Sequence, residues 1–112
     1  MYVAPALPPG NVSVQNADTS GSIRVEWDPL SEEATNGVLQ GYIVYYREEN
    51  YYRYVHYYHY HEYLGKNVNT TSAETKVVLR NLDAGKTYEI SVAAFTRYMG
   101  PRSEWQRIVV GK

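Results

Sequence analysis

Residues 23–29 read Ile23-Arg24-Val25-Glu26-Trp27-Asp28-Pro29, and this stretch does most to decide the fold. Apolar residues alternate with charged ones through it. Successive side chains of a β-strand point to opposite faces, so the alternation predicts a strand with one buried and one solvated face. We expect Trp27 to face the core. Pro29 should end the strand, because proline has no N–H to donate to a neighbouring strand.

Similar runs lie on both sides of this stretch. After a polar loop at residues 30–40 comes Gly41-Tyr42-Ile43-Val44-Tyr45-Tyr46-Arg47, whose β-branched and aromatic residues favour a strand. Tyr42, Val44 and Tyr46 are expected to face inward. Ile43 and Tyr45 then lie on the opposite face. Further strands are predicted at residues 12–14, 75–80, 87–95 and 105–110.

The spaces between these runs contain turn residues, with a polar loop at 96–102. Apolar residues do not keep helical spacing over the 11 or so positions that a helix prediction requires, so no helix is expected. Six or seven short strands separated by turns indicate an all-β fold. We therefore predict an antiparallel β-sandwich of two sheets.

Five short motifs occur in an order that is typical of one family. They are Pro8-Pro9-Gly10-Asn11-Val12, the stretch 23–29, the strand 41–47 preceded by Asn36-Gly37, Leu82-Asp83-Ala84-Gly85-Lys86-Thr87-Tyr88, and Gly100-Pro101-Arg102-Ser103. Over residues 8–110 the chain resembles a fibronectin type III domain. The resemblance implies an immunoglobulin-like sandwich of about seven strands. It also divides the chain into a tail at 1–7 and a domain at 8–112.

The spacing from Leu82 to Tyr88 resembles the tyrosine corner of Greek-key sandwiches, in which a tyrosine hydroxyl bonds to backbone upstream. The family commonly has proline in this turn, and Ala84 stands at that place here. The structural core that the resemblance implies consists of Trp27, Tyr42, Leu82 and Tyr88.

The resemblance also implies a class of function. Fibronectin type III domains are commonly repeated in tandem in receptors, adhesion molecules and matrix proteins, and residues 41–47 are most similar to modules of neural adhesion molecules and receptor-type tyrosine phosphatases. We therefore expect an extracellular or cell-surface location, with another protein, neighbouring domains or a second copy of the chain as partner. The N-terminus lacks the charged region of a signal peptide, so such a domain is expected to be a segment of a longer chain.

Residues 48–72 depart from the family pattern, because a typical module needs about half as many residues here. We predict an enlarged hairpin after the third strand. It contains seven of the chain's 13 tyrosines. Tyrosine offers a large amphipathic contact area at low entropic cost, which favours a protein contact surface. The alternatives are tyrosines that pack on their own domain, or self-association along an exposed strand. The candidate contact residues are Tyr51, Tyr52, Tyr54, Tyr57, Tyr58, Tyr60 and Tyr63.

Three histidines, His56, His59 and His61, lie in the same segment. In a strand only His59 and His61 share a face, no thiolate accompanies them, and the spacing matches no common zinc site. We therefore predict no metal and no cofactor. A weaker hypothesis is pH sensing, since the three side chains would gain charge together below about pH 6.5.

Two sequons make Asn69 and Asn11 candidate N-glycosylation sites. Asn69 is preferred, because its polar surroundings predict a loop. Asn11 lies close to a predicted strand. Further on, Arg102-Ser103-Glu104-Trp105 resembles half of the tryptophan–serine box of cytokine receptors, but the first tryptophan and the family's cysteines are missing. Trp105 is instead expected to lie on a sheet surface and to stack with Arg97 or Arg107.

Composition excludes several other classes of function. Eleven Lys and Arg residues balance twelve Asp and Glu residues, whereas a nucleic-acid-binding domain needs a basic face. No apolar run is long enough to insert in a membrane. No nucleophile motif, phosphate loop or dinucleotide fingerprint is present, so no catalytic residues are predicted. With no cysteine, the chain can form no disulfide.

Three functions remain in competition. The first is a protein-interaction module that uses the tyrosine-rich hairpin. The second is a structural spacer in a tandem array, and the third is an engineered binder on a fibronectin scaffold. Burial of the tyrosines within their own domain would argue against the first. The position of the segment argues against the third, since designed diversity usually occupies loops at one end of the sandwich.

Overall fold

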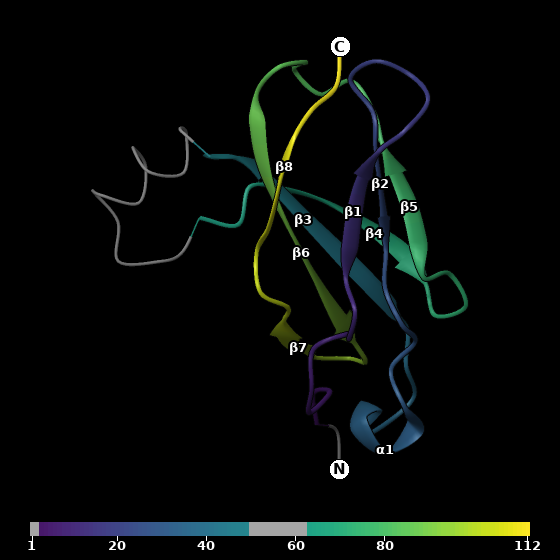
Figure 1. The fold of residues 1–112 in the computed structure, drawn as a ribbon. Helices are drawn as coiled ribbons and strands as arrows, with labels where there is room; N and C mark the ends of the chain where they lie inside the picture. The colour runs from purple at the N-terminus through teal and green to yellow at the C-terminus, as the bar shows by residue number, and fades with distance from the viewer. Residues whose placement is uncertain (1–2, 50–62) are drawn as a thin grey trace.

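The computed structural model describes residues 3–49 and 63–112, and these form two antiparallel sheets packed face to face (Figure 1). This arrangement confirms the predicted all-β sandwich. The smaller sheet has the order β1 (Ser13–Asn16), β2 (Ile23–Glu26), β5 (Lys76–Leu79). The larger sheet has the order β4 (Lys66–Thr71), β3 (Gly41–Glu48), β6 (Thr87–Phe95), β7 (Met99–Arg102), and β8 (Gln106–Val109) also pairs with β6.

The inner core lies between the two sheets and is built by alternation along each strand. The indole of Trp27 meets the ring of Tyr42 edge to face, with 5.4 Å between the ring centroids. Trp27 is only 4% exposed, and its Nε1–H has no hydrogen-bond partner among the described residues. Burial of apolar area is the main force that holds the sheets together. The cluster consists of Ile23, Val25, Trp27, Tyr42, Val44, Leu79, Tyr88, Ile90, Val92, Ala94 and Val110.

Two buried tyrosines find partners for their hydroxyl groups at the margin of this core. The Asp83 backbone N–H donates to Tyr88 Oη at 3.1 Å. This is the tyrosine-corner geometry, with Leu82 packed against the core beside it. The Leu30 N–H donates to Tyr42 Oη at 2.9 Å. Both bonds tie a loop to the core, because a buried phenol needs a polar partner.

One element contradicts the expectation that the chain has no helix. The loop before β3 contains α1 (Glu32–Thr35), a single turn that ends where Asn36 adopts a left-handed conformation with φ of 55°. A turn of this length cannot produce a helical repeat in the sequence.

The larger sheet differs from the predicted boundaries at two further places. β3 and β4 form an antiparallel hairpin in which Tyr46 lies opposite Lys66. The polar run at Asn69, expected to be a loop, is therefore part of β4. Residues 99–102, also expected to be loop, pair with β6 as β7, with an irregular register. Polar composition misled both predictions, because an edge strand can be solvated along much of its length.

The two ends of the described chain lie at opposite ends of the sandwich, with the N-terminal end between α1 and β7 (Figure 1). Within residues 3–49 and 63–112, no helix has the length and apolar character needed to cross a membrane.

Candidate protein-contact surfaces

The face of the larger sheet that points away from the core carries a second buried cluster. Alternation along β3 turns Ile43 and Tyr45 to this side, and each is only 8% exposed. They pack with Ala93 of β6, and with Leu64 and Trp105, which are partly buried. We call these five residues the outer cluster. This face of the larger sheet is therefore largely covered, and β3 is buried on both sides.

Arg47 extends the outer cluster and is 4% exposed. Its Nε donates to Glu89 Oε1 at 3.1 Å, and one terminal nitrogen donates to the Tyr63 carbonyl oxygen at 2.6 Å. A buried cation is tolerated only when it is paired and hydrogen-bonded. The second bond joins β3 to the chain just ahead of β4. Arg47 therefore fixes the point where the tyrosine-rich segment returns to the sandwich.

Trp105 lies on the same face under two guanidinium groups. The Cζ atom of Arg47 is 3.5 Å from the centroid of the indole ring, and that of Arg102 is 4.6 Å away. Both distances are within cation–π range. The predicted stacking partners were Arg97 or Arg107, whereas the structure places Arg47 and Arg102 over the ring. Arg47 comes close to Trp105 because β3 and β8 both pair with β6.

Two buried serines hold the segment that carries Trp105. Val92 N–H donates to Ser103 Oγ at 2.9 Å, and Ser91 Oγ donates to the Ser103 carbonyl at 2.6 Å. These bonds attach the connection between β7 and β8 to β6. They leave Trp105 in a defined position over the outer cluster.

Burial has an electrostatic consequence at Tyr45. Removal of the phenol from water disfavours the phenolate, so burial raises the pKa of Tyr45 above its ordinary value. The phenolate of Tyr45 is therefore disfavoured in the folded state, which matters only at alkaline pH, near the ordinary tyrosine pKa of about 10.

Gly65 controls how the chain rejoins the sheet at β4. Its φ is +79°, and a Cβ at this position would collide with the Tyr46 carbonyl and with the side chain of Arg47. Only glycine satisfies both conditions without strain. The root of the hairpin is therefore built by Gly65 and Arg47 together.

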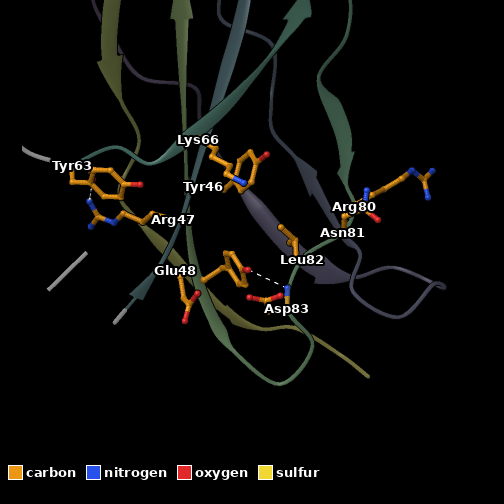
Figure 2. A pocket seen from close by; sticks show the side chains of 10 residues that line it. Tyr46, Arg47, Glu48, Tyr63, Lys66, Arg80, Asn81, Leu82 and Asp83 are labelled. Carbon is orange, nitrogen blue, oxygen red and sulfur yellow. Dashed lines mark hydrogen bonds between the residues drawn. The ribbon is translucent and has the colours of Figure 1, made fainter. Parts of the chain in front are cut away.

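A hollow of about 640 Å³ lies between this root and the turn before β6 (Figure 2). Tyr46 and Lys66 border one side, while Leu82 and Asp83 border the other (Figure 2). The lining mixes positive and negative groups. In the described part of the chain, no three His, Cys, Asp or Glu side chains are grouped to hold a metal ion.

The N-terminal end of the sandwich presents exposed apolar side chains from three separate segments. Asn36 Nδ2 donates to the Ala4 carbonyl at 3.2 Å, and Thr96 Oγ1 donates to the Val3 carbonyl at 3.0 Å. These bonds bring the first residues, the loop after α1 and the turn after β6 together. We call these exposed side chains the N-terminal apolar patch. They are Val3, Leu7, Val38, Tyr98 and Met99.

The predicted contact residues are described only in part. Six of these tyrosines and the three histidines lie outside the described residues. They are Tyr51, Tyr52, Tyr54, Tyr57, Tyr58 and Tyr60, with His56, His59 and His61. Tyr63 is half-buried, and its carbonyl is bonded to Arg47.

The two sequon asparagines have different surroundings. Asn69 is an exposed residue of β4. Asn11 is exposed with φ of 50°, and its Nδ2 donates to Asp28 Oδ2 at 2.6 Å.

The roles of Arg47, Glu89 and Leu64 were not predicted from the sequence. The signal that could have revealed the first two is a cross-strand pair of opposite charge, since Arg47 lies directly opposite Glu89. Using that signal requires the register of β3 against β6, which depends on a contact between residues far apart in the chain.

Comparison with known proteins places the whole sandwich in one family. Residues 7–108 match the fibronectin type III domain. In structure, the chain is similar to the crystal structure of chicken CNTN1 FN1–FN3 domains, with a TM-score of 0.77 and 28% identity. The similarity covers 97% of this chain and 33% of that one.

Two human proteins are similar in sequence. Protein sidekick-1 is 33% identical over 104 residues, which cover 81% of this chain. The cell adhesion molecule DSCAM is 37% identical over 101 residues, which cover 89% of this chain. The chain spans only 5% of the length of sidekick-1 and 4% of that of DSCAM.

Proposed function

The chain belongs to the fibronectin type III family, and on that premise we propose that it is a non-catalytic protein-interaction module of an extracellular, cell-surface adhesion protein. We further propose that the tyrosine-rich segment Tyr51–Tyr63 is its contact surface. The observation that carries the first proposal is the match to DSCAM and sidekick-1 over most of the domain.

The root of the tyrosine-rich segment supports a contact role. On one side β3 extends to Glu48, and on the other Arg47 holds the Tyr63 carbonyl while Gly65 turns the chain into β4. A segment fixed at both ends loses less conformational freedom on binding than one attached to flexible linkers. Its seven tyrosines are the residue type enriched at interface hot spots.

The shape of the module supports a second candidate function, that of a spacer in a tandem array. The two ends of the described chain lie at opposite ends of the sandwich (Figure 1). The N-terminal apolar patch surrounds the first described residues, and one of its side chains, Val38, is 76% exposed. An apolar patch of this kind suits the end of a neighbouring module, and packing there would stiffen the junction.

A binding experiment separates the two functions. Beads that carry the chain would be tested against surfaces coated with the chain itself and with the DSCAM and sidekick-1 ectodomains. We expect the unaltered chain to bind at least one of these surfaces. Replacing Tyr51, Tyr54, Tyr57 and Tyr60 by serine should weaken it at least about tenfold, because truncating one hot-spot residue costs upward of about 1–2 kcal/mol.

A matched control changes the N-terminal apolar patch instead, by replacing Val38 and Tyr98 with serine. This variant should bind these surfaces as the unaltered chain does. Binding that survives the four tyrosine changes would refute the contact surface. So would a failure of the unaltered chain to bind any of the three coated surfaces, and the spacer function would then be favoured.

A further inference from the structure

We propose that Asn69, and not Asn11, carries an N-linked glycan, and that this glycan covers the open edge of the larger sheet at β4. The inference rests on the proposed extracellular function, because N-glycans are added in the secretory pathway. It goes beyond that function by assigning a modification to one of two sequons and a physical role to the sugar.

The register of β4 places the sequon toward solvent. Asn69 lies opposite Ile43, and Thr71 lies opposite Gly41. Ile43 belongs to the outer cluster, so Asn69 projects from the outer face of the sheet. Thr71 lies two residues further along the strand and shares that face. Both residues are exposed.

The surroundings of Asn69 leave room for a bulky group. Val68 packs against the inner core, and Asn69 therefore points away from it. No hydrogen bond to the Asn69 side chain occurs among the described residues, so its amide nitrogen can carry a sugar without loss of a native contact. Thr71 Oγ1 donates only to Glu74 Oε1, at 3.2 Å, on the exposed turn after β4.

Asn11 is in the opposite situation. Its amide nitrogen donates to the Asp28 carboxylate at 2.6 Å, and the Asp28 N–H donates to the Gly10 carbonyl at 2.9 Å. These two bonds lock the start of the domain against the end of β2. A sugar on Asn11 would crowd this charge-assisted bond, whereas a sugar on Asn69 displaces nothing.

The position of β4 gives the glycan a purpose. In the described part of the chain β4 pairs only with β3, so its other edge has no strand partner. An open edge is a template for pairing with another chain, and proteins protect such edges with charge, proline, bulges or a covering group. The strand Lys66–Thr71 has no proline and only one charged residue. A bulky, solvated glycan on Asn69 would protect it.

The first test measures the occupancy of each sequon. The chain would be secreted from a eukaryotic cell line, and the two sequon peptides would be analysed by mass spectrometry before and after enzymatic deglycosylation. We expect Asn69 to be occupied in most molecules and Asn11 in few. Thr71→Ala should abolish the modification, while Thr71→Ser keeps the sequon and the hydroxyl and should retain it.

The second test asks what the glycan does. Sedimentation of the secreted chain should give a monomer at every concentration. The Asn69→Gln variant should show an average sedimentation coefficient that rises with concentration. An Asn11→Gln variant is the matched control and should behave as the unaltered chain does.

The outcomes separate this inference from the proposed function. A secreted, folded chain with Asn69 unmodified, or with Asn11 occupied equally, overturns the site assignment and leaves the extracellular function standing. An Asn69 glycan whose loss leaves sedimentation unchanged overturns the protective role. A chain that does not fold when directed to the secretory pathway overturns the extracellular function itself.

Discussion

The two faces of β3 are both buried, but different chemistry covers them. Inward, Tyr42 and Val44 enter the inner core, where the ring of Tyr42 packs against Trp27. Outward, Ile43 and Tyr45 lie beneath Trp105 and beside the charged side chain of Arg47. The inner core excludes water by close packing, whereas the outer cluster lies beside a buried cation, Arg47, that is paired with Glu89.

The outer face also has a connection to the tyrosine-rich segment that the inner core lacks. The outer cluster holds the root of the tyrosine-rich segment through the bond from Arg47 to the Tyr63 carbonyl. The inner core has no such connection to the segment within the described residues. We therefore expect changes to the inner core to affect mainly folding, and changes to the outer cluster to affect both folding and the position of the segment.

Trp27→Ala should have the largest effect. It removes the largest side chain of the inner core, and such truncations cost about 3–5 kcal/mol of the free energy of unfolding. Trp27→Phe should cost much less, because the indole Nε1–H has no partner to lose among the described residues. Urea unfolding followed by circular dichroism measures both. A loss from Trp27→Phe as large as that from Trp27→Ala would mean that the indole nitrogen contributes a stabilising bond.

Arg47→Ala should rank second, at about 1.5–3 kcal/mol, the range for hydrogen bonds that involve a charged group. It also leaves Glu89, a mostly buried carboxylate, without its partner. Arg47→Met combined with Glu89→Gln should recover part of the loss, because no charge is then stranded. An Arg47→Ala variant as stable as the unaltered chain would show that the charged contacts beside the outer cluster do not stabilise the fold.

Tyr88→Phe should cost about 1 kcal/mol, since it removes one acceptor from the Asp83 N–H while keeping the ring. Tyr98→Phe is the matched control, because Tyr98 is exposed and should tolerate the change. The same urea titration applies. Equal effects of the two variants would show that the corner hydroxyl contributes nothing to the inner core.

The pH dependence at Tyr45 should be the smallest effect near neutrality. Burial raises the pKa of its phenol in the folded state above the unfolded value of about 10. The resulting stability is fully present below the unfolded pKa and is lost as pH rises through the folded one. The temperature of thermal unfolding should therefore fall more steeply between pH 8 and pH 11 for the unaltered chain than for Tyr45→Phe. Parallel curves would contradict burial of Tyr45 in the outer cluster.

Much of the inner core was predictable from local pattern. Alternation through residues 23–27 predicts an inward Trp27, and alternation through 41–46 predicts an inward Tyr42 and Val44, because side chains in a strand repeat every two residues. The single turn of α1 was not predictable, since it is too short to leave a periodic signal. Nor was β4 at Asn69, because its polar residues resemble a loop until their pairing with β3 is known.

The outer cluster could not be deduced in the same way. Trp105 and Arg47 are 58 positions apart in the chain, and nothing local to either indicates the other. They meet because β3 and β8 both pair with β6. Sequence by itself therefore determined the family, the sandwich and its inward residues, since period-two alternation and turn chemistry act between near neighbours. Only the tertiary structure decided that the second face of β3 is covered. It alone also decided that the Asn11 amide is bonded to Asp28 while the Asn69 amide has no bond among the described residues, because both outcomes depend on contacts between distant segments.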